Sequence, residues 1–365
     1  MTRPRIPCSA PAPREDAASV RAAIDRVLAS GWFILGPEVN AFEAEFAAAC
    51  GAASAIGVGN GTDAIAVILR ALGIGPGDEV ITSPLSAAYS ALAIMMTGAR
   101  AVFADIDPQT LTLDAAAVAS AITPQTRAIL PVHLYGQAAD MTSLEHVASR
   151  HGLAMVEDCC QAHLATANGR PVGTIGIAGA FSFYPTKNLG ALGDGGAVVT
   201  NDSALAERVR RIRNGGQTDR YHHEIAGVNS RLDEMQAAIL RARLPFLTGW
   251  TAARRRLAAT YRRALSGAPV RVIAERDSGH VYHLFVVRSP RRDALQQHLR
   301  GRGIETLVHY PIPIPAQAAM RDQKPQDCPT ATAACGEVLS LPMYPSLGDA
   351  EIEDVASSVS SFPED

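Results

Sequence analysis

Short apolar runs alternate with segments of helical periodicity from residue 54 to about residue 214. This alternation is typical of a sheet whose mainly parallel strands are connected through helices. Strands are predicted at residues 54–58, 79–82, 101–105, 128–133, 153–157, 179–183 and 195–200. The pattern therefore predicts an α/β fold with a seven-stranded, mainly parallel sheet that is flanked by helices.

The segment after the first predicted strand has a clear helical period. Its apolar residues follow the i, i+3, i+4, i+7 spacing of one helix face, at Ile65, Ile68, Leu69 and Leu72. We predict a helix over residues 61–72, which the glycine-rich and proline-containing segment 73–78 ends.

The pattern changes at about residue 230, where two long helices are expected, and a domain boundary near residues 245–250 follows. We predict a large domain over residues 1–247, which includes an N-terminal helical segment, and a small C-terminal α+β domain over residues 248–365. The small domain is expected to contain a strand at 281–287 and an arginine-rich helix at 291–301.

The composition excludes several classes of protein. The chain has 365 residues, of which 47% are hydrophobic and 19% charged, so it can bury a sizeable core and is not disordered. The N-terminus lacks the apolar stretch of a signal peptide and the six cysteines form no C-x-x-C pair, so we expect free thiols in a cytoplasmic protein. Residues 80–99 are uncharged, but Pro84 and small polar residues interrupt them, so no membrane span is expected.

The formal net charge is −3, yet residues 201–300 hold 19 arginines against nine acidic residues. This segment fits a solvated helix face, and it also fits the attraction of a phosphorylated substrate. No aromatic-rich basic motif accompanies the arginines, so no nucleic-acid partner is expected.

Two of the 33 basic residues are lysines, Lys187 and Lys324. Neither lies in the Gly-Lys-Ser/Thr sequence of a P-loop, which excludes a P-loop NTPase. Lys324 lies in a polar stretch and is expected to be an exposed loop residue, whereas Lys187 lies in a glycine-rich loop between two predicted strands. Because a lysine can lose its proton and form a Schiff base but an arginine cannot, we predict a chemical role for Lys187.

A Schiff-base lysine requires a carbonyl group, and pyridoxal phosphate is the common cofactor that supplies one. This cofactor also needs a carboxylate beside its ring nitrogen. Asp158 ends the apolar segment 153–158, and ligands of open α/β sheets gather at such strand ends, although the segment alone also fits a turn aspartate. Glu157 is expected on the opposite face of the same strand.

The cofactor's phosphate needs backbone N–H groups at the start of a helix. Gly61 and Thr62 lie where the first predicted strand leads into the predicted helix, and Ser182 precedes Lys187 by five residues. A simple tight turn is an equally good interpretation of the glycines alone. Their spacing fails the G-x-G-x-x-G pattern, which disfavours an NAD-dependent oxidoreductase. No metal site is expected, because several histidines are isolated in the sequence, as structural histidines commonly are: His133, His163, His283 and His309.

Eight segments, in order along nearly the whole chain, resemble the sugar aminotransferases of the DegT/DnrJ/EryC1/StrS family. They are GWFILGPEV (31–39), GVGNGTDAI (57–65), GIGPGDEVI (73–81), PVHLYG (131–136), VEDCCQAH (156–163), FSFYPTKNLGALGDGGAV (181–198), NSRLDEMQAAIL (229–240) and HYPIP (309–313). The resemblance implies a fold-type-I pyridoxal-phosphate enzyme and a homodimer with active sites at its interface. It also implies transfer of an amino group from L-glutamate to a nucleotide-linked keto sugar.

The resemblance implies roles for individual residues. Lys187 corresponds to the Schiff-base lysine and Asp158 to the partner of the pyridine nitrogen, and family dehydratases have histidine at the position of Lys187, which favours amination. Further roles are implied at the cofactor ring (Gln161), at its phosphate (Gly61, Thr62, Ser182 and, from the neighbouring subunit, Asn229) and at the substrate (Tyr184, His309 and Tyr310). Many members place an aromatic residue over the ring where this sequence has Ala87, with Tyr89 two positions further on.

The sequence of segments 31–39 and 229–240 is most similar to members that aminate C3 of dTDP-linked 3-keto-6-deoxyhexoses in antibiotic or surface-polysaccharide pathways. Amination of a nucleotide-linked 4-keto sugar or of a keto-cyclitol is an alternative. A pyridoxal-phosphate-binding regulator without turnover is another.

Overall fold

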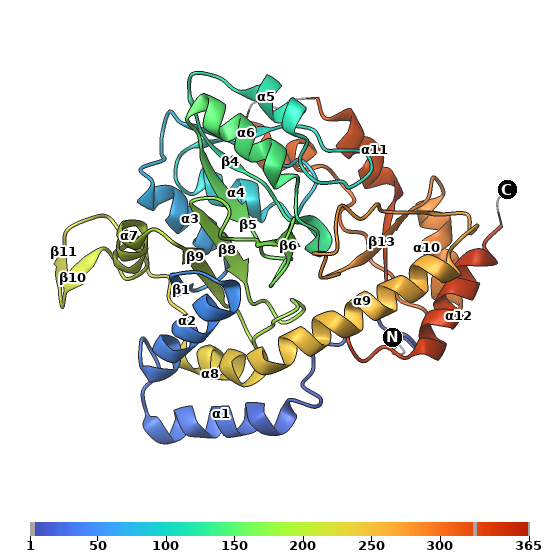
Figure 1. Ribbon diagram of the computed structural model, residues 1–365, viewed down its shortest axis with the longest axis horizontal. Helices are drawn as coiled ribbons and strands as arrows, with labels where there is room; N and C mark the ends of the chain where they lie inside the picture. The colour runs from blue at the N-terminus through green and yellow to red at the C-terminus, as the bar shows by residue number, and fades with distance from the viewer. Residues whose placement is uncertain (1–3, 324–326, 364–365) are drawn as a thin grey trace.

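The computed structural model describes residues 4–323 and 327–363, so Lys324 lies outside the described residues. A seven-stranded sheet with the order β1-β9-β8-β5-β4-β2-β3 forms its centre (Figure 1). The strands are β1 (Ser54–Val58), β2 (Glu79–Thr82), β3 (Arg100–Phe103), β4 (Thr126–Leu130), β5 (Ala154–Asp158), β8 (Ala178–Ser182) and β9 (Gly196–Thr200). Strand β9 is antiparallel to β8 and β1, and the other neighbours are parallel. The predicted fold is confirmed, and each predicted strand overlaps an observed one.

Helices cover both faces of this sheet. One face packs against α3 (Gly61–Ala71), α4 (Tyr89–Met95) and α7 (Ser203–Arg213). The other packs against α2 (Pro37–Cys50), α5 (Ala115–Ala121), α6 (Met141–His151) and α8 (Glu234–Arg243), and α1 (Ala17–Ser30) lies against α8. Successive side chains of a strand point to opposite faces, so Val80 enters the first core and Ile81 the second.

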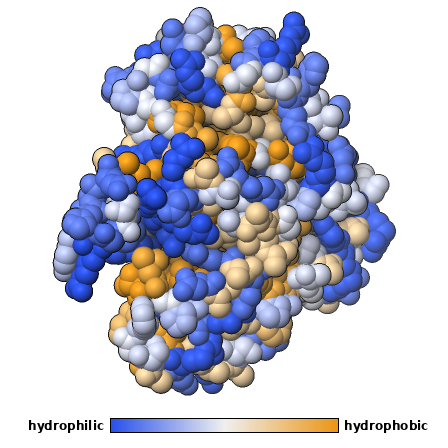
Figure 2. All heavy atoms as spheres, turned by 60° about the vertical axis from the view of Figure 1, so that its left-hand side comes forward, coloured by the Kyte–Doolittle hydropathy of each residue, from blue (hydrophilic) through white to orange (hydrophobic). Residues whose placement is uncertain are grey.

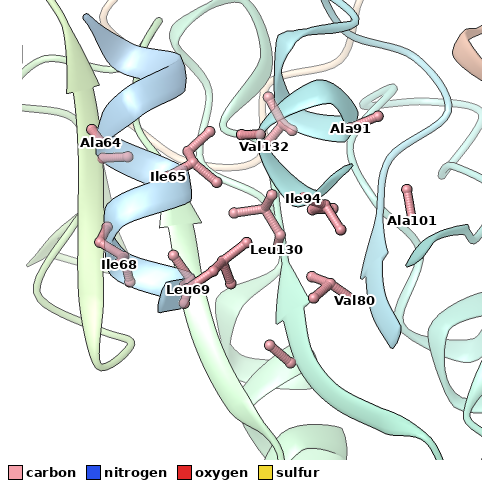
Figure 3. Close-up of a cluster of buried hydrophobic side chains, with 14 of the residues drawn as sticks. Ala64, Ile65, Ile68, Leu69, Val80, Ala91, Ile94, Ala101, Leu130 and Val132 are labelled. Atoms are coloured by element: carbon pink, nitrogen blue, oxygen red, sulfur yellow. The ribbon is translucent and has the colours of Figure 1, made fainter. Parts of the chain in front are cut away.

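Helix α3 confirms the predicted helix at 61–72, and its apolar face packs onto the sheet. Ile65, Ile68 and Leu69 are buried against strand residues such as Leu130 (Figure 3). The side chain of Asn60 caps the helix by accepting a hydrogen bond from the backbone N–H of Asp63 at 2.9 Å. The capped end of the helix follows β1 after two residues, so it lies at the carboxyl end of that strand.

The C-terminal part forms a second, smaller sheet with its own core. Its elements are α9 (Leu247–Ala264), β12 (Arg271–Val272), β13 (Phe285–Arg288), α10 (Arg292–Gly301), α11 (Pro329–Glu337), β14 (Val338–Leu341) and α12 (Asp349–Ser360), and the strand order is β12-β13-β14. Helix α9 contributes Leu247 to a core of the large sheet and Tyr261 to the C-terminal core, which Ile6 of the N-terminal segment also joins. The division at residues 247 and 248 remains our proposal for the domain boundary.

Short elements complete the chain. They are η1 (Leu134–Gly136), β6 (Thr166–Ala167), β7 (Arg170–Pro171), β10 (Gln217–Asp219), β11 (His222–His223), η2 (Leu244–Phe246), η3 (Ile314–Ala316) and η4 (Ala318–Met320). The β10–β11 hairpin projects from the body of the molecule beside α7 (Figure 1). Among the described residues, no helix combines the length and apolar character that a membrane crossing requires.

Candidate active site

The carboxyl ends of β5 and β8 and the start of α3 border a cavity of about 1080 Å³. Most of the residues that the sequence analysis selected line this cavity. They are Gly61, Thr62, Asp158, Gln161, Ser182, Tyr184, Lys187, His309 and Tyr310. The fold thus brings together side chains from segments that lie far apart in the sequence.

Lys187 lies in the turn that follows β8, and its backbone N–H donates to the carbonyl oxygen of Tyr184 at 2.8 Å. Its side chain is partly exposed, and it reaches solvent through the cavity that it lines. Burial lowers the pKa of Lys187, while the nearby Cys160 thiol and Asp158 carboxylate oppose that shift. A lysine with a lowered pKa is more often a neutral amine, which is the nucleophilic form.

Asp158 is the last residue of β5 and is 5% exposed. One carboxylate oxygen accepts a hydrogen bond from the Ser90 hydroxyl at 2.7 Å, and the other accepts from the Cys160 backbone N–H at 3.1 Å. Two donors therefore hold an acidic group at the cavity wall, where it can pair with a positively charged ligand atom.

Glu157, one residue earlier, does not line the cavity and is fully buried. Its carboxylate accepts hydrogen bonds from the backbone N–H groups of Gly173 (2.8 Å), Ile175 (2.9 Å) and Gly176 (2.8 Å). His133 Nε2 lies 3.0 Å from the same carboxylate, and because His133 Nδ1 accepts from a backbone N–H, Nε2 carries the donated proton. The hydrogen-bonding groups of Glu157 and His133 are therefore satisfied within the protein, and we interpret the pair as structural.

The start of α3 forms a cradle for an anion. A Cβ added to Gly61 would lie 2.6 Å from Cys160 Sγ and 2.8 Å from Ser182 Cβ, so only glycine allows this close approach. The first-turn N–H groups, including those of Gly61 and Thr62, have no partner within a helix, and the helix dipole favours negative charge there. Ser182 also lines the cavity, and its side chain lies next to Gly61.

A network of hydrogen bonds forms another part of the cavity wall. The Gln161 side-chain oxygen accepts from the Tyr135 backbone N–H at 2.7 Å, so its nitrogen donates to the Tyr310 hydroxyl at 3.1 Å. The Tyr135 hydroxyl donates to the His309 carbonyl oxygen at 2.5 Å. Burial lowers the pKa of His309 to about 4, so its imidazole is neutral near pH 7.

Ala87 and Tyr89 both line the cavity, and Tyr89 begins helix α4. Tyr89 is one of three tyrosines in the cavity lining, with Tyr184 and Tyr310, that could cover a ring bound here. Asn229, in contrast, is exposed and does not line the cavity of its own chain. Its backbone forms an isolated bridge with Asn214 beside the projecting hairpin.

The sequence analysis missed Ser90 and treated His283 as a structural residue, but both line the cavity. The Asn188 side-chain nitrogen donates to the Val281 carbonyl at 3.0 Å, so the Asn188 oxygen lies toward His283 Nδ1, at 3.2 Å. His283 Nδ1 therefore carries a proton, and Nε2 is left as an acceptor. The sequence contains no local signal that places Ser90 and His283 in the cavity, because their contacts are with residues far away in the sequence.

The donor set fits pyridoxal phosphate. Lys187 could provide an amine for a Schiff base, Asp158 a carboxylate for the ring nitrogen, and the start of α3 with Ser182 donors for the phosphate, since all of them line one cavity. Gly61 lets the start of α3 pack closely against Cys160 and Ser182, which brings the helix N–H groups and the Ser182 side chain to the same part of the cavity wall.

Comparisons with known proteins identify the family of this chain. The model of the DegT/DnrJ/EryC1/StrS aminotransferase family matches residues 14–360. The chain is 50% identical over 352 residues to the dTDP-3-amino-3,4,6-trideoxy-alpha-D-glucose transaminase of Streptomyces venezuelae, covering 95% of this chain and 93% of the relative. It is 49% identical over 338 residues to the erythromycin biosynthesis sensory transduction protein EryC1 of Saccharopolyspora erythraea, covering 92% of each. A crystal structure of S. venezuelae DesV in complex with a ketimine intermediate superposes with a TM-score of 0.96 at 48% identity, covering 99% of each chain.

Proposed function

Because the chain belongs to the DegT/DnrJ/EryC1/StrS aminotransferase family, we propose that it transfers the amino group of L-glutamate to a nucleotide-linked keto sugar. The overall reaction converts glutamate and the keto sugar into 2-oxoglutarate and the amino sugar. The observation that carries this proposal is the shared cavity of Lys187, Asp158 and the start of α3, which together fit pyridoxal phosphate.

When bound, pyridoxal phosphate supplies an electron sink for the negative charge that develops on the reacting carbon. Lys187 is the proton-transfer group, since its lowered pKa makes the neutral amine available to take a proton from the donor Cα. In the second half of the reaction, Lys187 returns a proton to the carbon that is aminated. Asp158, fixed by Ser90 and Cys160, provides the negative charge that favours a protonated ring nitrogen.

We favour a dTDP-linked 3-keto-6-deoxyhexose as the acceptor, because a relative with 50% identity is named as a transaminase of a dTDP-3-amino-trideoxyglucose. Tyr184, His309 and Tyr310 are our candidates for contacts with the sugar, since they line the cavity beside Lys187. Pathways of antibiotic or surface-polysaccharide synthesis consume such amino sugars. The free cysteines suit a cytoplasmic location.

We further propose a homodimer with shared active sites. Trp32, Phe33 and Ile34 expose between 41% and 57% of their surface, and Figure 2 shows apolar patches on one face of the molecule. Such exposed apolar groups commonly mark a protein interface. We assign Asn229 to the phosphate in the cavity of a second copy, because it does not line the cavity of its own chain.

The test is to incubate the purified protein with pyridoxal phosphate, glutamate and a panel of dTDP-linked 3-keto and 4-keto sugars. Mass spectrometry should detect an amino sugar, with the 3-keto compounds preferred. Lys187→Arg keeps a positive charge but cannot act as a neutral amine, so it should form no product.

The name of the relative from S. erythraea favours a second candidate, a regulatory protein without turnover. Incubation with glutamate in the absence of a sugar distinguishes an aminotransferase from such a regulator. An aminotransferase should release about one equivalent of 2-oxoglutarate per subunit before any sugar is added, whereas a regulator should release none.

A further inference from the structure

A second cavity of about 170 Å³ adjoins the candidate active site. The N-terminal segment 8–16, helix α9 and residues 343–346 contribute to its walls. Both cavities are lined by Thr186, Lys187, His283, Leu284 and His309. These five residues form a common boundary, so a molecule that reacts beside Lys187 lies next to the second cavity.

Arg254 on α9 gives this cavity a buried positive charge, with 6% of its surface exposed. One terminal nitrogen donates to the carbonyl oxygens of Tyr282 (3.1 Å), His283 (3.3 Å) and Met343 (3.1 Å). Its Nε has no hydrogen-bond partner, and the guanidinium pairs with no carboxylate in residues 4–323 and 327–363. Burial lowers the pKa of Arg254 to about 10, as expected for a charge without a counter-ion.

The acidic residues at this cavity are already engaged. Asp16 pairs with Arg243 at 2.8 Å, and the Glu15 carboxylate accepts from the Trp250 indole N–H at 2.6 Å. Arg14 also lines the cavity and forms no ion pair within the part of the chain that the structure describes. The cavity is therefore suited to an anionic ligand.

The volume limits the size of that ligand. A cavity of about 150 Å³ in another protein holds benzene, so this one accommodates a short carboxylate-bearing chain. A nucleotide-linked sugar is far larger and needs the neighbouring cavity of about 1080 Å³.

We propose that the second cavity binds the side-chain carboxylate of a dicarboxylic amino donor, with Arg254 as its main counter-charge and Arg14 as a second one. This inference rests on the proposed function. The α-carboxylate shares a carbon with the reacting amino group and stays near Lys187, whereas the side-chain carboxylate lies further along the donor. A carboxylate here supplies the counter-ion that Arg254 lacks.

The test compares donors in the first half of the reaction. Arg254→Met should raise the KM for glutamate about 10- to 100-fold. Glutamine is similar in shape to glutamate but lacks the side-chain charge, so its KM should change little. The KM for the keto sugar should also change little. Arg255→Met is the matched control, because Arg255 lies on the same helix and donates to the His280 carbonyl at 2.9 Å but does not line the cavity.

A second variant guards against misfolding, since Arg254 also holds three carbonyl groups. Arg14 has an exposed side chain, and Arg14→Gln should raise the KM for glutamate roughly 2- to 5-fold. Calorimetry with glutarate measures binding without turnover, and Arg254→Met should weaken it about 10-fold or more.

An equal loss with glutamate and glutamine, or unchanged glutarate binding in both variants, overturns the inference. Absence of 2-oxoglutarate release by the unmodified protein is a different result, because it overturns the proposed function itself.

Discussion

The carboxylate of Asp158 depends on a residue from another element. Ser90 belongs to α4, and its hydroxyl donates to Asp158 at 2.7 Å at the cavity wall, where both residues are at least 95% buried. Hydrogen bonds to charged groups are stronger than neutral ones, and more so away from water. The orientation of this carboxylate is thus determined by α4 as well as by β5.

We expect Ser90→Ala to lower kcat about 5- to 10-fold, because a buried carboxylate loses one of two donors, at a cost of about 1 kcal/mol. Stopped-flow measurement of the glutamate half-reaction checks this. Ser83→Ala is the matched control, since Ser83 is equally buried but its hydroxyl bonds to the backbone of Leu85 and not to a charged group. If the two variants lose the same activity, the Ser90 contact has no specific role.

Among individual residues, the sequence predicts those whose chemical role only one or two residue types can fill. Lys187 and Asp158 are recognisable because a Schiff base requires an amine and a pyridine nitrogen requires a carboxylate. Ser90 and His283 are common residue types in ordinary segments. Their roles arise from contacts between residues 68 and 95 positions apart, and no local pattern contains that information.

The start of helix α2 is stabilised by a side chain from a distant part of the sequence. Helix α2 begins after Gly36, which has no side chain to cap it. The buried Glu234 carboxylate, from the first turn of α8, accepts instead from the N–H groups of Gly36, Glu38 and Val39, each at 2.8 Å. A negative charge at a helix start also interacts well with the helix dipole.

Glu234→Ala should therefore lower the free energy of unfolding by about 2–4 kcal/mol, because three buried N–H groups lose their acceptor. Urea unfolding at fixed protein and cofactor concentrations measures the change. Glu207→Ala, which removes an exposed ion pair with Arg211, should cost no more than about 0.5 kcal/mol. Similar losses in both variants would argue against the cap.

The sequence predicts the presence of helices and strands better than it predicts the residues at which they begin and end. Apolar runs and the period of α3 are local signals, so the strands and that helix were found. The predicted strand at 281–287 is wrong at its start, because β13 covers only Phe285–Arg288. Residues 281 and 284 instead bond across to the backbone of η1, so tertiary contacts shorten the strand.

The stability of the whole molecule should depend on buried neutral histidines. Burial lowers the pKa of His163 and His280 to about 3 and that of His309 to about 4, from an ordinary value of 6.5. Below pH 6.5 the unfolded chain binds protons that the folded chain does not. Stability must therefore fall as the pH falls toward 4, by up to about 1.4 kcal/mol per pH unit for each histidine.

His163→Phe tests this origin of acid sensitivity. The His163 ring lies between Phe181 and Phe183, at centroid distances of 5.6 and 5.7 Å, so another flat ring fits there. Urea midpoints at pH 7, 6 and 5 should fall less steeply in this variant than in the unmodified protein. His151→Gln changes an exposed histidine and should leave the slope unchanged. An unchanged slope in His163→Phe would show that this histidine does not contribute.

The proposed dimer predicts that two defective chains restore each other. In a two-fold dimer with shared sites, a hybrid of Lys187→Ala and Asn229→Asp subunits has both defects in one site and none in the other. Each variant alone should be inactive or nearly so, whereas an equal mixture, unfolded and refolded together, should regain about a quarter of the unmodified activity. Mixing Lys187→Ala with Asp158→Ala is the control, because both residues line the cavity of the same chain and every site stays defective. If Asn229 acts within its own chain, neither mixture regains activity, and the shared-site proposal fails while the aminotransferase assignment stands.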